Sequence, residues 1–246
     1  MNTKIVKDTF IVAALKSLPD LKRNPSTMIL TSLISAFPLF FIIVFGGPVS
    51  SGLVGAIIAT VSFIGFSAAI QDIAYDRYWK IREMIVAMPV HPASYAIGVA
   101  LAPLLISTPG LIFFLCIAVA IGTLPLSSIG WTIVVLIMVW AAGSSIAFII
   151  STYLRKASVY VLNNMATILG LGLVFLPPVY YSERVLGSYA WVSIIFPTSN
   201  AADLIRFYAG LTQMPSETVL LHWLILIATV IVSVILLSFK AKWRED

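Results

Sequence analysis

The charged side chains are distributed so unevenly along this chain that their pattern indicates whether water or lipid surrounds most of the protein. Residues 24–71 and 84–154 contain no Asp, Glu, Lys or Arg. A soluble protein needs charge on its surface, whereas an ionised side chain at the centre of a bilayer costs ~2.5–3.5 kcal/mol. With 60% hydrophobic and 10% charged residues overall, the pattern predicts a protein whose body lies in a membrane.

Apolar runs long enough to cross a bilayer, which takes ~20 residues, recur along the whole chain. They cover approximately residues 26–45, 52–71, 94–122, 130–153, 159–176 and 219–239. The third run is too long for an upright helix, and Pro103 and Pro109 are placed to kink it. We therefore expect an all-α, polytopic membrane protein with six transmembrane helices in a single transmembrane domain, residues 1–246.

Two regions outside these runs predict additional helices. Residues 4–18 have an amphipathic pattern and predict an interfacial helix on the inner leaflet. Residues 177–217 are apolar for much of their length, which favours short helices dipping into the outer leaflet over a free loop. An aromatic belt at the headgroups is the simpler alternative. Within this region, Asp203 and Arg206 are three residues apart on a predicted helix and can pair.

The basic residues predict the orientation. If six spans place both termini on one side, that side carries all of the 15 Lys and Arg residues except Arg184 and Arg206. Cytoplasmic loops are enriched in Lys and Arg, so both termini should be cytoplasmic in a cell (plasma) membrane. The net charge of +5 does not indicate nucleic-acid binding, because the cations are not gathered on one face with aromatic side chains.

The most polar internal stretch, residues 72–92, follows the second predicted span. Asp76 and Lys80 are spaced i,i+4 with the acid first, which favours a helix. One face is charged, and the other carries Trp79, Ile81 and Ile85. Such a helix suits docking into the groove of a partner. A simple interfacial linker explains the same pattern equally well.

This stretch resembles the coupling-helix region of type-2 (export-type) ABC transporter permeases. The shared pattern is an acid–Arg pair, a Glu seven residues after the acid, an apolar pair and a Pro six residues after the Glu; here these are Asp76-Arg77, Glu83, Ile85-Val86 and Pro89. The family often has Gly-Thr where this chain has Lys80-Ile81. Two further segments resemble the family's entry into its first span and its outer loop: Arg23-Asn24-Pro25 with Phe37-Pro38-Leu39, and Leu176-Pro177-Pro178 with Phe196-Pro197 and Arg206.

The resemblance implies a membrane permease subunit of an ATP-driven exporter, which forms the translocation path as a dimer. The residues expected to couple to the ATPase are Asp76, Arg77, Lys80, Arg82, Glu83, Pro89, Arg155 and Lys156. The candidates for lining the pathway are Phe63, Phe66, Gln71, Asn163, Asn164 and Thr167. The outer re-entrant region would include Pro177, Pro178, Pro197 and Arg206.

The chain offers little chemistry of its own. It has no G-x-x-x-x-G-K-[ST] phosphate loop, and His91 and His222 lack neighbours with metal-ligand spacing. We therefore expect no catalysis, no cofactor and no metal in this chain, with ATP and Mg bound by cytoplasmic ABC ATPase subunits as partners. The predicted spans contain no charged residue to couple an ion gradient. Two alternatives stay open: a non-transporting scaffold that recruits a cytoplasmic partner, and an ion-driven carrier.

Overall fold

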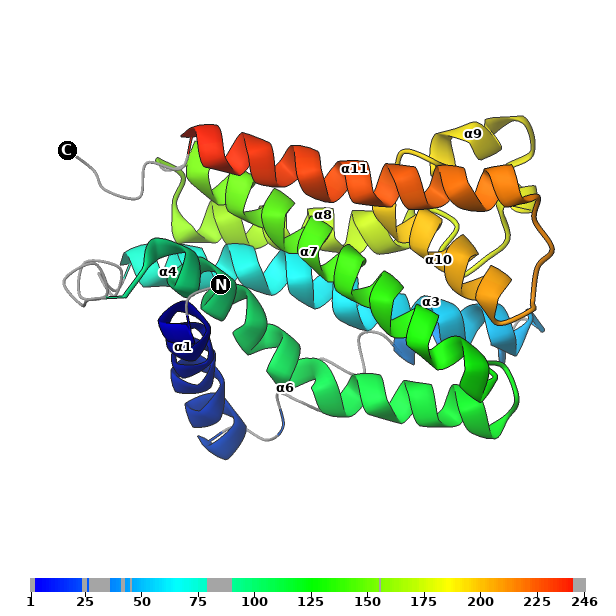
Figure 1. The fold of residues 1–246 in the computed structure, drawn as a ribbon, viewed down its shortest axis with the longest axis horizontal. Coiled ribbons are helices and arrows are strands. Elements are labelled where there is room, and N and C mark those ends of the chain that lie inside the picture. The colour runs from blue at the N-terminus through cyan, green and yellow to red at the C-terminus, as the bar shows by residue number, and fades with distance from the viewer. Residues whose placement is uncertain are drawn as a thin grey trace.

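The computed structural model describes residues 3–23, 26, 36–40, 43–44, 46–78, 90–154 and 156–240. Within these residues the backbone forms helices joined by turns, without a strand. The all-α prediction is therefore confirmed. Figure 1 shows that the long helices run side by side along the longest axis of the molecule.

The centre of the bundle is one continuous helical stretch, made of α3 (Val49–Phe63), η1 (Ile64–Ala68) and α4 (Ala69–Tyr78). The middle segment, η1, is a π-helix, a wider turn that occurs mostly as a local insertion within α-helices. Residues 52–62 of α3 are all buried. The sequence predicted that this span would end near residue 71, but the helix continues to Tyr78.

Three long helices surround this central stretch: α6 (Pro92–Ala120), α7 (Ile129–Tyr153) and α8 (Val159–Phe175). Pro103 and Pro109 lie inside α6, and Figure 1 shows α6 bending along its course, as prolines within a helix predict. A short 3₁₀ turn, η2 (Leu126–Ser128), leads into α7. The hydroxyl of Ser158 accepts a hydrogen bond from the Val161 amide and so caps the start of α8.

Four helical stretches among the described residues are long and apolar enough to cross a membrane: Val49–Asp76, Ser94–Ala120, Leu126–Tyr153 and Ser216–Leu236. The last belongs to α11 (Ser216–Lys240). Helix α8 is apolar but shorter. The predicted first span, 26–45, falls largely outside the described residues. Four of the predicted spans are thus supported, and the total of six stays a prediction.

The N-terminal segment forms a helix, α1 (Thr3–Arg23), which is longer than the predicted 4–18. It packs on α6. Thr9, Val12 and Ala13 are buried, whereas Phe10 and Leu15 are exposed. Exposed large apolar side chains next to lysines are typical of a helix at a membrane surface.

Three short elements lie between α8 and α11: η3 (Glu183–Tyr189), α9 (Ala190–Ser193) and α10 (Pro197–Tyr208). Pro197 occupies the first turn of α10, where its missing N–H costs nothing. Gly210 has a positive φ of 73°, and the amides of Gly210 and Leu211 bond back to the carbonyls of Phe207 and Arg206. This arrangement is a Schellman motif, which ends the helix.

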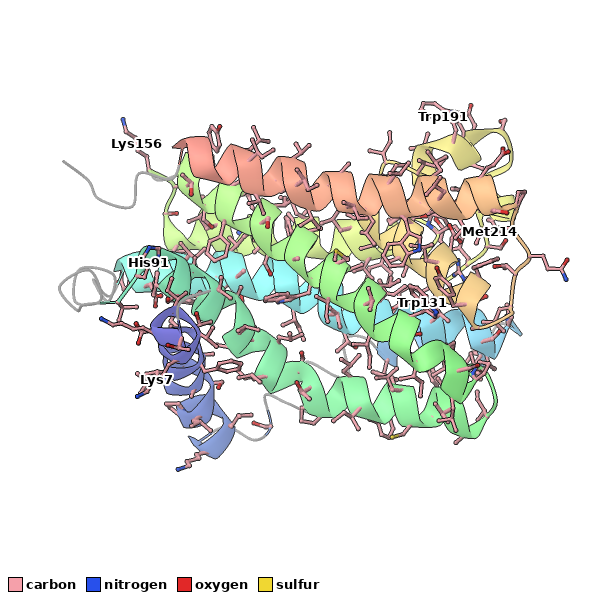
Figure 2. The ribbon with its side chains drawn as sticks, viewed as in Figure 1. Lys7, His91, Trp131, Lys156, Trp191 and Met214 are labelled. Carbon is pink, nitrogen blue, oxygen red and sulfur yellow. The ribbon has the colours of Figure 1, made fainter. Side chains whose placement is uncertain are left out.

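The bundle has two distinct ends. We call the end where α1 lies and α4 terminates the α1 end, and the end that carries η3, α9 and α10 the α10 end (Figure 1). Lys7, His91 and Lys156 lie at the α1 end, whereas Trp131 and Met214 lie at the α10 end (Figure 2). The turn between α7 and α8 therefore lies at the same end as the C-terminus of α4.

Candidate functional site

The residues predicted to contact an ATPase fall at the α1 end, as far as the structure describes them. Lys156 is exposed in the turn before α8. Asp76 and Arg77 belong to the last turns of α4, and the structure describes only the backbone of Arg77. Lys80, Arg82, Glu83, Pro89 and Arg155 lie outside the described residues.

Asp76 is not a surface side chain within this chain. It is 4% exposed, and its Oδ2 accepts hydrogen bonds from Lys16 Nζ at 2.6 Å and from the Tyr95 hydroxyl. The Lys16 side chain is 20% exposed, so that the cation retains access to water. Asp76 therefore joins α1 and α6 to the end of the central helix, and its part in contacting a partner stays a prediction.

Close backbone contact reinforces the attachment of α1. The Ser94 hydroxyl donates to the Ile5 carbonyl at 3.1 Å. A Cβ placed on Gly98 would lie 2.7 Å from Val12 Cβ, well inside van der Waals contact. Small residues allow helices to approach this closely in membranes. Sequence reasoning missed Lys16, Tyr95 and Gly98, because nothing in their local pattern indicates contacts with such distant segments.

The helices that carry the predicted pathway residues of spans two and five meet inside one chain. A Cβ on Gly170 of α8 would lie 3.1 Å from the ring of Phe63, and Asn163 Nδ2 donates to the Tyr75 hydroxyl at 3.1 Å. Phe66 is 1% exposed and packs in the core between α7 and α8. Gln71 is half-buried. The two helices are neighbours, but Phe66 lines no open surface in this state.

The outward face of α8 is the part of the predicted pathway that is exposed. Asn164 and Thr167 lie on it, together with Tyr160 and Ile168, which are 83% and 69% exposed. The Thr167 hydroxyl donates to the Asn163 carbonyl one turn earlier. An amide side chain directed at lipid is costly, so this face suits contact with protein or with a polar pathway better than contact with acyl chains.

The predicted outer residues are all buried at the α10 end. Pro177, Pro178, Pro197 and Arg206 have little exposed surface. Arg206 is 3% exposed and donates to the Pro178 carbonyl at 3.1 Å and to the Val179 carbonyl at 2.6 Å. It also pairs with Asp203 at 3.1 Å, which confirms the predicted i,i+3 pair. Arg206 thus fastens α10 to the loop that follows α8.

Further polar contacts fix α10 inside the bundle. Asn200 Nδ2 donates to the carbonyls of Ile194 and Phe196, so its Oδ1 is an acceptor and His222 Nδ1, 2.6 Å away, must carry the hydrogen. Thr198 donates to the Leu173 carbonyl. A helix this polar and this deeply buried is held by specific partners rather than by apolar packing alone.

Burial also changes the ionisation of this helix. Desolvation raises the pKa of Asp203 from 3.8 to about 7; the positive charge of Arg206 opposes this shift, and the neighbouring Glu183 carboxylate adds to it. Burial lowers the pKa of Arg206, although the negative charge of Asp203 opposes that change. In the adjoining loop, burial raises the pKa of Tyr180. Carboxylates of this kind often mark functional positions.

Aromatic side chains hold the outer face of α10. The rings of Trp131 and Tyr208 stack with centroids 4.8 Å apart and an interplanar angle of 6°. Trp223 Nε1 donates to the Tyr208 hydroxyl at 3.0 Å. Since Trp131 lies in the first turn of α7 and Trp223 lies in α11, this cluster ties α10 to two of the apolar helices.

A comparison with known protein families identifies the family of this chain. A family profile described as ABC-2 family transporter protein matches residues 47–239, from the start of the central helix almost to the end of α11. The chain belongs to the ABC-2 transporter family. No curated protein matches the chain.

Membership in the ABC-2 family indicates the role of this helical bundle. The chain is a multi-pass membrane protein and a permease subunit of an ABC transporter. Such a subunit contributes the membrane path and works with ABC ATPase subunits. The resemblance stated from residues 76–89 and the two proline-containing regions is thereby confirmed at the level of the family.

Proposed function

We propose that this ABC-2 permease is the membrane half of an ATP-driven exporter, that two copies or two related permeases form the path, and that cytoplasmic ATPases drive it. The observation that carries the proposal is the exposed face of α8, where Asn164 and Thr167 point outward from an apolar helix. A second copy placed there would cover these polar groups. The path would then lie between the two α8 helices, next to Phe63 and Gln71.

The α1 end supplies the contact for the ATPases. The segment 79–89 follows directly after the central helix, and Lys156 is exposed at the same end (Figure 2). Because α4 is continuous with α3, a push on segment 79–89 would act along the axis of the most buried helix of the bundle. ATP and Mg would be bound by the ATPases, and this chain would contribute no catalytic group. The basic residues favour a cytoplasmic position for this end in the cell membrane.

Disulfide cross-linking tests the dimer. In a Cys116→Ser background, Thr167→Cys on α8 should give a covalent dimer upon oxidation in native membranes. The matched control is Ile112→Cys, which is 53% exposed on α6 and should stay monomeric. Cross-linking through residue 112 without cross-linking through residue 167 would place the interface elsewhere.

Co-purification tests the ATPase contact. Arg77→Glu, Glu83→Lys and Lys156→Glu should each lower recovery of the cognate ATPase, because all three alter charges near the end of α4 or in the α7–α8 turn. Glu217→Lys, at the exposed start of α11, is the control that should leave recovery unchanged. Equal recovery by all four variants would refute this contact.

Reconstitution in liposomes separates the three candidate functions. An exporter requires the ATPase subunit and ATP for vectorial movement of solute. A scaffold binds its partner without any flux. A carrier driven by an ion gradient moves solute with the permease alone, and that result would overturn the proposal.

A further inference from the structure

A groove opens between α1 and α6 where the two helices cease to touch. Near the start of α6 they are in close contact, since Val12 lies against Gly98. Beyond this contact Pro103 interrupts the hydrogen bonding of α6, and α1 runs across the direction of the long helices (Figure 1). The helices therefore diverge and leave a cavity of about 660 Å³. Sites for small molecules have volumes of ~300–1,000 Å³.

The walls of the groove are one stripe of residues from each helix. Within each stripe the residues recur at intervals of three and four positions, which places them on one helix face. They are Ala14, Ser17, Leu18 and Leu21 of α1, with Leu105, Thr108, Pro109 and Ile112 of α6. The Thr108 hydroxyl donates to the Leu104 carbonyl of its own helix, so its hydrogen is not available to a ligand. The lining is almost entirely apolar and therefore suits hydrocarbon.

The groove faces outward from the bundle, because Leu18, Leu105 and Ile112 are 49%, 41% and 53% exposed. Residues 105–112 lie in the middle of the candidate span Ser94–Ala120, so the surroundings at this depth are lipid tails. An apolar concavity that no atoms fill loses dispersion contacts, and water finds no polar partners in it. The occupant with the right chemistry is an acyl chain.

The charges beside the groove suit an anionic headgroup. Lys22 follows directly after the lining residue Leu21 and is exposed. Lys16 is already paired with Asp76, so Lys22 is the better placed of the two to bind a phosphate. Helix α6 contributes no charge of either sign. Basic side chains next to a membrane attract anionic phospholipids.

We propose that this groove is a binding site for an anionic phospholipid from the leaflet at the α1 end. One acyl chain lies between α1 and α6, and the phosphate lies near Lys22. The lipid thereby completes the packing of α1 against the bundle. The site is formed within one chain, so it does not depend on the exporter assignment.

Photolabelling of the full chain in lipid nanodiscs tests the groove. The probe is phosphatidylglycerol that carries a photoactivatable group on one acyl chain. The label should attach to residues 14–21 and 105–112 several-fold more often than to residues 227–235 of α11. That stretch is the matched reference, because its Ile227, Ile231 and Ile235 are 40%, 51% and 45% exposed. Equal labelling of the groove and of α11 would mean that the groove holds no lipid of its own, and would overturn the proposal.

Variants that fill the groove test its position. Ala14→Phe and Thr108→Phe each place a ring in the groove, from opposite walls, and each should lower labelling of the facing helix several-fold relative to α11. The control is Val232→Phe, at a 52% exposed position of α11, which should leave labelling of the groove unchanged. Undiminished labelling in both groove variants would contradict the proposal. The wild-type measurement does not depend on how these variants fold.

The lipid composition of the nanodiscs tests the headgroup. Unlabelled phosphatidylglycerol should displace the probe better than phosphatidylcholine with the same acyl chains. Lys22→Gln should reduce this preference about fivefold, the factor that corresponds to ~1 kcal/mol per basic residue near a charged membrane surface. Lys156→Gln removes an exposed cation that lies away from α1 (Figure 2), and it should keep the preference. Equal displacement by the two lipids in the wild type would rule out an anionic ligand.

Discussion

Each end of the bundle has a cation–carboxylate pair on a helix outside the four candidate spans, but the two pairs lie in different surroundings. At the α1 end, Lys16 keeps 20% of its side chain in solvent while it binds Asp76. At the α10 end, Arg206 is buried and also donates to two backbone carbonyls. A lysine suffices where water completes its hydration, whereas a buried cation needs the several fixed donors of a guanidinium.

The comparison also concerns the helices themselves. One face of α1 lies on α6, and the opposite face is exposed. Every residue of α10 from Pro197 to Arg206 is buried, although half of them are polar. The position of α1 thus depends on a few contacts along one side, and that of α10 on a closed set of hydrogen bonds. Removing one member should therefore be more damaging at the α10 end.

The largest expected effect is at Arg206. Arg206→Met should lower the free energy of unfolding by about 3–5 kcal/mol, because it leaves a buried acid and the carbonyls of Pro178 and Val179 without their donor. Chemical unfolding of the purified chain in detergent micelles measures this. Lys156→Met, which removes an exposed cation, is the control and should change stability by less than about 0.5 kcal/mol. If the two variants lost a similar amount of unfolding free energy, the contacts of Arg206 with Asp203 and with the Pro178 and Val179 carbonyls would contribute little to stability.

Glycine-to-alanine substitutions should also destabilise the α10 end more than the α1 end. A Cβ on Gly55 would lie 2.4 Å from the buried Tyr180 ring, so Gly55→Ala should cost about 1–3 kcal/mol through overpacking. Gly98→Ala should cost less, because α1 can move away from α6 towards its open side. Gly130→Ala, where no heavy atom lies within 4 Å, is the control and should be neutral or slightly stabilising. A greater loss at Gly98 than at Gly55 would reverse the comparison.

At the α1 end, Lys16→Met should cost about 1–2 kcal/mol by leaving Asp76 with one donor fewer. The loss should be smaller in an Asp76→Asn background, since the uncompensated charge is then gone. A double-mutant cycle on the unfolding free energy measures the coupling. Additive losses would mean that the ion pair seen here does not hold α1 in place.

The smallest expected effect is at Tyr95. Tyr95→Phe removes one hydroxyl donor from Asp76 and leaves Lys16 in place, so it should cost about 1 kcal/mol. The same unfolding assay applies, and Tyr160→Phe on the exposed face of α8 is the control. A loss as large as that of Lys16→Met would assign the attachment mainly to the phenol.

The sequence predicts the body of this protein well, because lipid imposes a simple rule on it. Apolar runs without charge located α6, α7, α8 and α11 to within a few residues, and they located the start of the central helix but not its end, which lies seven residues further on at Tyr78. The pattern of charged, apolar and proline residues in residues 76–89, together with the two proline-containing segments elsewhere in the chain, indicated the family. The helix positions and the family motif both depend on residues that are close together in the sequence, so the local pattern of residue types is sufficient to find them.

The sequence does not predict which polar groups are buried. The Asp203–Arg206 pair is visible from its spacing, but its burial depends on the carbonyls of Pro178 and Val179 in another segment. Asp76 was interpreted as a surface contact because its partner Lys16 is sixty positions away in the chain. Long-range pairs of this kind require the packing of α1 on α6, for which no local pattern exists.

The π-helical turn in the central span has a consequence for reading mutational data. A regular α-helix advances about 100° per residue, and the residue accommodated by a π-turn offsets whatever follows it by about that angle. Segments 49–63 and 69–78 therefore behave as two helices joined with an azimuthal offset. A scan of substitutions along this span should show tolerant and intolerant positions that alternate with helical periodicity before Ile64. After Ala68 the same periodicity should return, with the tolerant face rotated by a little over a quarter turn about the helix axis.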